Sequence, residues 1–178
     1  MSSYLIVSAL GENQKGLVNE LASLASSSGC NIVDSRMTLL GNQFTVIMLL
    51  KGEWNSLATM EHRLPPIASQ WGLTTMIKRT TPPTINTERL PYRVKVIARD
   101  NPGIISEIAE FFYQRDVHIV DLQSDSYLAP HTQVEMVILK LQINILSNIN
   151  IAKFRQTFIH FCESENHEVS IEPLLHQT

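Results

Sequence analysis

The sequence lacks several features that would point to a secreted or membrane protein. Its only two cysteines, Cys30 and Cys162, form neither a metal-type pair nor a framework of bridges, which favours a reducing compartment. The apolar run LIVSAL at residues 5–10 is too short to cross a membrane, and no basic segment precedes it. We therefore expect a soluble, cytoplasmic protein that does not associate with membranes.

A surplus of basic residues is also missing. The chain carries 14 Lys and Arg against 17 Asp and Glu, a net charge of −3. Non-specific binding to nucleic acid depends on many Lys and Arg contacts with phosphate, so direct binding to DNA or RNA is not indicated. The strand-like run YRVKVIA at residues 92–98 could belong to an RNA-binding sheet, but the exposed stacking aromatics that such a sheet needs are not there.

Catalytic and cofactor motifs are absent as well. The sequence contains no GxSxG, HExxH, Walker-type glycine loop or GxGxxG. The only close His/Cys pair is HFC at residues 160–162, which is weak evidence for a metal. A small acylphosphatase-like hydrolase would need an arginine and an asparagine held together by a loop, and no such loop is found. We predict a protein that is not an enzyme and has no cofactor or metal.

What the sequence does contain is an internal repeat. The segment QKGLVNELASLASSSGCNIVD (14–34) aligns without a gap with NPGIISEIAEFFYQRDVHIVD (101–121). Gly16 aligns with Gly103 and Asp34 with Asp121, each pair 87 positions apart. The apolar positions of both segments follow one face of a helix. The same structural unit is therefore expected twice in the 178 residues.

Each half shows the order β-α-β-β-α-β, which predicts an α+β fold of two ferredoxin-like domains. Each domain would have an antiparallel four-stranded sheet with two helices on one face. In the first half we expect strands at 3–10, 30–40, 43–51 and 73–79, and helices at 15–28 and 54–70, the second interrupted or bent by Pro65 and Pro66. In the second half we expect strands at 92–98, 117–127, 132–143 and 167–173, and helices at 103–115 and 150–164. The predicted domains are 1–80 and 91–178, joined by a polar, proline-bearing linker at 81–90.

The second repeat unit begins its helix with DNPGII at residues 100–105. Asp100 or Asn101 can cap the helix, Pro102 suits its first position, and Gly103 removes a side chain there. A helix N-terminus with bare N–H groups allows close packing, or it binds an anion. Residues 13–17 of the first half, NQKGL, offer the same choice.

These stretches resemble the ACT domain, a small regulatory module that binds amino acids. The resemblance lies in Asn or Asp three residues before the loop glycine, a helix that opens on Leu or Ile, and the second strands opening with NIVD and HIVD. It implies that a small amino acid, with glycine as the first candidate, is held where the two halves meet. The carboxylate would be received by N–H groups at 15–17 or 103–105. The ligand-binding residues so predicted are Asn13, Gln14, Lys15, Gly16, Leu17, Asn31, Asp100, Asn101, Gly103, Ile104 and His118.

Less specific interpretations of these residues remain open. Asn13 and Asp100 could be ordinary helix caps, and Asn31 and His118 ordinary polar residues beside a turn. The Asp100 side chain would repel a ligand carboxylate, so the second half need not hold an equivalent site. Asp34 and Asp121 are expected to be solvated carboxylates. Cys30, which aligns with Val117, is expected to be a buried thiol rather than a nucleophile.

Two such domains with nothing else attached imply an allosteric regulator. By resemblance, it would repress transcription of glycine cleavage genes by binding a DNA-binding activator protein rather than DNA. A tandem protein–protein interaction module without a ligand is the alternative. Whether the halves pair within one chain or between the chains of a homodimer is left open by the sequence.

Overall fold

The computed structural model describes residues 3–82 and 88–174. The chain separates into two compact units, Met1–Thr84 and Ile85–Thr178. The first unit contains β1 (Ser3–Glu12), α1 (Leu17–Ser27), β2 (Asn31–Leu40), β3 (Gln43–Gly52), α2 (Trp54–Gln70) and β4 (Leu73–Thr80). The second contains β5 (Arg89–Arg99), α3 (Ile104–Tyr113), β6 (His118–Leu128), β7 (Glu135–Leu146), α4 (Ile151–Ser164) and β8 (Glu168–Pro173). Strand β5 begins inside the predicted linker, and residues 83–87 of that linker lie outside the described part.

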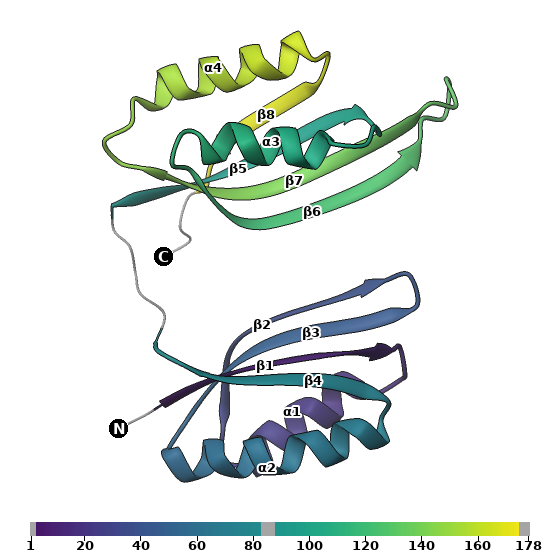
Figure 1. The fold of residues 1–178 in the computed structure, drawn as a ribbon, viewed down its shortest axis with the longest axis vertical. Coiled ribbons are helices and arrows are strands. Elements are labelled where there is room, and N and C mark those ends of the chain that lie inside the picture. Colours follow the sequence, from purple (N-terminus) through teal and green to yellow (C-terminus); the bar gives the residue numbers. More distant parts are fainter. Residues whose placement is uncertain (1–2, 83–87, 175–178) are drawn as a thin grey trace. The chain divides into compact units, whose positions relative to one another are not determined.

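Each unit has one four-stranded antiparallel sheet, in the order β2-β3-β1-β4 and β6-β7-β5-β8. In each unit both helices cover the same face of the sheet, and the opposite face carries no helix (Figure 1). We call this uncovered surface the open face. The α+β prediction of two ferredoxin-like domains is confirmed.

The alternating pattern of the strands explains how each sheet is covered. In β1, Leu5, Val7 and Ala9 are buried against the helices, while Tyr4, Ile6 and Ser8 point to the open face. Helices α1 and α2 bury Leu21 and Leu57 against the same core. A buried Val, Leu or Ile side chain contributes about 1.5–3 kcal/mol relative to an exposed one, so this face holds each unit together.

The second unit builds its core differently, around aromatic side chains. Phe158 of α4 is completely buried, and its ring centroid lies 4.9 Å from those of Phe111 and Phe112 in α3. The helical face of α3 therefore meets α4 through rings, where α1 presents leucines and alanines to the core. The two units share a topology without sharing the composition of their cores.

Pro65 and Pro66 do not interrupt α2, which runs from Trp54 to Gln70. The helix is not interrupted at this point, because it buries Leu57, Met60, Leu64 and Ala68 along one face over 17 residues. Both prolines are exposed. The carbonyls of Glu61 and His62, which lose their intrahelical donors, can therefore bond to water.

Candidate functional site

The loop from Asn13 to Gly16 joins β1 to α1 and contains most of the predicted site residues of the first half. Gly16 is the N-cap residue with φ 97°, and Gly103 is its counterpart at α3 with φ 104°. Neither helix receives a side-chain hydrogen bond at its cap. Asn13 and Asp100 are therefore not caps, and Pro102 precedes the cap instead of opening the helix.

The loop glycine also has a conformational reason. A Cβ added to Gly16 would meet no atom within 4 Å, so no protein group crowds this position. Glycine is needed because a left-handed φ is strained for residues that carry a Cβ. A substitution at Gly16 would therefore cost backbone strain and not a steric clash.

Three backbone amides at the start of α1 can bind a ligand. The first intrahelical hydrogen bond runs from the Glu20 amide to the Gly16 carbonyl, at 3.0 Å. The amides of Leu17, Val18 and Asn19 therefore have no acceptor inside the helix. Their partial positive charge adds to that of the helix dipole, and this end of the helix favours a carboxylate.

A hollow of about 650 Å³ lies beside this helix start. We call it the α1 hollow; its lining residues are Asn13, Gln14, Lys15, Gly16, Leu17, Val18, Asn19, Ala22, Met37, Leu39 and Phe44. Five of them, Asn13 to Leu17, were predicted from the sequence. The other six were missed, although the alternation of Met37 and Leu39 along β2 could have placed both on the helix-covered face.

The polar groups of the loop are held in different ways. The Asn13 amide donates to the Asn42 carbonyl at 3.1 Å, which fixes the backbone but leaves the exposed side chain available. The Gln14 side-chain amide uses one N–H to donate to the Trp71 carbonyl at 3.1 Å, and its carbonyl oxygen can still accept a hydrogen bond. Lys15 is exposed and provides the positive charge of the loop.

The corresponding loop of the second unit is less suited to a carboxylate. The Ile104 amide donates to the Asn101 carbonyl at 3.4 Å, which uses the first amide of α3. Asp100, whose own amide donates to Glu135, replaces the neutral Asn13, and Pro102 replaces Lys15. The loop thus gains a negative charge and loses a positive one.

Asn31 and His118 do not join these loops. Asn13 bonds to Asn42 at one end of the sheet, whereas Asn31 pairs with Lys51, nine residues further along the chain. At about 3.4 Å per residue this is roughly 30 Å. In the second unit, Asp100 bonds to Glu135 while His118 pairs with Asn144, at the other end of β7. Within one unit, no amino acid could touch both members of either pair.

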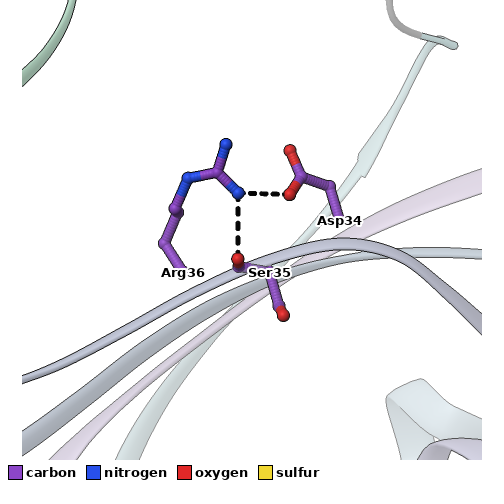
Figure 2. A network of polar contacts seen from close by, with 3 residues as sticks. All are labelled: Asp34, Ser35 and Arg36. Carbon is purple, nitrogen blue, oxygen red and sulfur yellow. Dashed lines mark hydrogen bonds and ion pairs between the residues drawn. The ribbon is translucent and has the colours of Figure 1, made fainter. Parts of the chain in front are cut away.

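The repeated aspartates lie just after a bulge in the edge strand of each sheet. The register shifts between Ile32 and Asp34 in β2, and between Ile119 and Asp121 in β6. Figure 2 shows the Arg36 guanidinium directed at the Asp34 carboxylate, with a second hydrogen bond to the Ser35 carbonyl at 2.9 Å. Both charged side chains are more than half exposed, which agrees with the expected solvated carboxylate.

Both thiols are buried, as was predicted for Cys30. Burial raises the pKa of the Cys30 thiol, and it raises that of Cys162 to about 12, with a smaller contribution from Glu163. Thiolates are therefore scarce at neutral pH. Across residues 3–82 and 88–174, no three His, Cys, Asp or Glu side chains gather as a metal site would require. No helix in these ranges is long and apolar enough to cross a membrane.

Comparison with known proteins identifies the family. A sequence profile of the ACT domain matches residues 3–78. The glycine cleavage system transcriptional repressor of Escherichia coli (strain K12) is 32% identical over 168 residues, covering 94% of this chain and 88% of the relative. The repressor of Shigella flexneri matches equally well. The chain belongs to the family of glycine cleavage system transcriptional repressors, and its two units are ACT domains in tandem.

Solved structures agree with this placement. A crystal structure of a protein assigned as a glycine cleavage system transcriptional repressor superposes with a TM-score of 0.73 at 26% identity, covering 98% of both chains. A protein of unknown function from Galdieria sulphuraria shares the fold alone, with a TM-score of 0.80 at 17% identity over 98% of this chain. The curated relatives are transcriptional repressors, so the prediction that the chain is not an enzyme is confirmed.

Proposed function

We propose that this protein is an amino-acid-responsive repressor that binds a small amino acid, glycine first, in the α1 hollow. It acts on glycine cleavage genes by binding a DNA-binding activator protein. The family membership supports the regulatory role. The observation that carries the ligand proposal is the loop Asn13–Leu17, where amides without helical acceptors, a lysine and two side-chain amides surround one hollow.

An amino acid can be placed there by its two charged ends. Its carboxylate accepts hydrogen bonds from the amides of Leu17, Val18 and Asn19, and Lys15 adds a positive charge beside them. Its ammonium donates to the side-chain oxygens of Asn13 and Gln14, because a side-chain amide carries an acceptor as well as donors. A ligand with no side chain meets no steric demand from Val18 or Met37, so glycine fits this arrangement.

The first unit is the proposed binding unit, and the second unit is the weaker candidate. Asp100 places a carboxylate where the first unit has Asn13, and no basic residue occupies the Lys15 position; Glu107 in the first turn of α3 has its counterpart in Glu20 of α1. A ligand carboxylate would be repelled there. The ammonium alone would gain from Asp100, which does not suffice to orient an amino acid.

Regulation would follow from linkage between ligand and partner. A ligand that binds better to the free protein than to its complex shifts the protein out of that complex. Coupling of the usual size, roughly 1–3 kcal/mol, changes the affinity for the partner about 5- to 150-fold. The acidic balance of the chain favours a protein partner over DNA, because non-specific DNA binding depends on a basic surface.

Calorimetric titration of the full chain with small amino acids tests the ligand proposal. We expect glycine to bind, Asn13→Ala and Lys15→Gln to weaken it, and the matched Asp100→Asn substitution in the second unit to leave it unchanged. No binding at millimolar concentration would reject the amino-acid sensor and leave the interaction module without a ligand. A gel shift of promoter DNA by this protein alone would instead reject the indirect route.

A further inference from the structure

The open face of the second unit carries a hollow that the amino-acid proposal does not use. It has a volume of about 450 Å³, and we call it the basic hollow. Its lining residues are Arg93, Val94, Lys95, Asp121, Gln123, Lys140, Leu141, Gln142 and Leu174. Three cations and one carboxylate give it a net positive charge.

Strand register explains why the charges gather. Lys95 of β5 stands directly opposite Lys140 of β7, and Arg93 stands opposite the next open-face residue of β7, Gln142. Like charges opposite each other on one face of a sheet destabilise it, because their Cβ atoms are only about 4.5–5.5 Å apart. The Lys95–Lys140 pair therefore lowers the stability of the sheet unless an anion binds between the two side chains.

Neighbouring acids neutralise the cluster only in part. Lys140 forms one loose ion pair with Asp125 at 3.6 Å, and both side chains are more than half exposed. Arg93 and Lys95 make no ion pair within 4 Å with any residue in 88–174, although Glu172 stands opposite Arg93 on β8. Within residues 88–174, two of the three cations therefore have no ion-pair partner.

The first unit provides an internal comparison, because a smaller hollow of about 160 Å³ lies at the matching place on its open face. There Ile6 stands opposite Leu49, and Ser8 opposite Ile47. On the edge strand, Asp34 and Arg36 correspond to Asp121 and Gln123. The bulge and the aspartate are thus common to both units, while the basic cluster belongs to the second unit alone.

We propose that the basic hollow binds a small anion with two or more negative charges, carried by phosphate or carboxylate groups. Such an anion bridges Lys95 and Lys140 and reaches Arg93, whose planar guanidinium suits either group. A macromolecular polyanion fits less well, because Asp125, Glu168 and Glu172 share the open face and interrupt any extended positive surface. The site is independent of the amino-acid proposal.

Titration calorimetry of the full chain in low-salt buffer tests this site, with pyrophosphate and citrate as probes. We expect at least one of them to bind, and added salt to weaken it, because the site is exposed. The double substitution Lys95→Gln and Lys140→Gln should lower the affinity about tenfold or more. Asp121→Asn should raise it, since it removes the one repelling carboxylate of the hollow.

The matched control is Lys51→Gln with Lys78→Gln, which removes two exposed open-face lysines of the first unit and changes the net charge equally. We expect it to leave the affinity unchanged. Thermal unfolding adds a second readout: Lys95→Gln alone should stabilise the ligand-free protein and abolish stabilisation by the anion. Failure of both probes to bind, or equal losses in the two double variants, would overturn the proposal. Glycine binding should be unchanged by every one of these substitutions.

Discussion

Arg79 of β4 and Glu61 of α2 are joined by two hydrogen bonds of 2.7 Å, one from Nε and one from Nη2. This fork-to-fork pair ties the second helix of the first unit to the edge strand β4. The Arg79 guanidinium also lies 5.7 Å from the ring centroid of Trp54 at the start of the same helix. One cation thus connects β4 to two turns of α2.

Acid should weaken this connection. The hydrogen bonds from Arg79 hold the pKa of the Glu61 carboxyl below its ordinary value. A carboxyl with a lowered folded-state pKa contributes stability above that value and loses it as the pH falls through the lowered pKa. We expect wild type and Glu61→Gln to differ by about 0.5–1 kcal/mol at neutral pH, because both side chains are one-third exposed.

Chemical denaturation at several pH values measures this difference. The difference in free energy of unfolding should shrink below about pH 4.5. There the Glu61 carboxyl is protonated first in the unfolded protein and, at lower pH, in the folded protein as well. Arg36→Gln is the matched control, because the Asp34–Arg36 pair is far more exposed and should contribute almost nothing. A constant difference from pH 7 to pH 3 would show that the Glu61 charge does not stabilise the fold.

Gly16 should be replaceable only at a cost in backbone strain. Gly16→Ala is expected to destabilise the protein by about 1–2 kcal/mol, because alanine tolerates a left-handed φ poorly and no contact offsets the strain. Gly16→Asn should cost less, since asparagine adopts this conformation more readily. Thermal unfolding ranks the stabilities of the two variants and the wild type. An alanine variant as stable as wild type would contradict the left-handed conformation of Gly16.

The two thiols should be protected from alkylation in the native state. With the pKa of Cys162 at about 12 and that of Cys30 raised by burial, almost no thiolate is present at neutral pH. We expect iodoacetamide to label neither cysteine in the folded protein and both in denaturant, as read by intact-mass spectrometry. Rapid native labelling of either one would show that its burial is transient.

Most of the fold could be predicted from the sequence. The repeat at an offset of 87 residues predicts two copies of one unit, and the alternation of apolar residues predicts the strands of each sheet. The loop glycine could also be found in the sequence, but its left-handed φ could not be read from the pattern. The separation of Asn13 from Asn31 follows from topology. Helix α1 returns the chain to the end of the sheet where β1 began, so β2 starts far from the β1–α1 loop.

Other features depend on contacts that no local pattern reports. The Gln14–Trp71 hydrogen bond joins residues 57 positions apart. The basic hollow depends on the register that sets Lys95 against Lys140, and on a bulge that shifts Asp121 by one residue. An uninterrupted strand would have turned Asp121 and Gln123 toward the helices instead.

The most direct test of the amino-acid site is an NMR titration of uniformly labelled protein with glycine, following each backbone amide. The account predicts saturable shifts at Leu17, Val18 and Asn19, much smaller shifts at Ile105 and Ser106, and loss of the response in Lys15→Gln. If the amides that open α1 stay unmoved while glycine binds elsewhere, or does not bind, the proposed site is wrong.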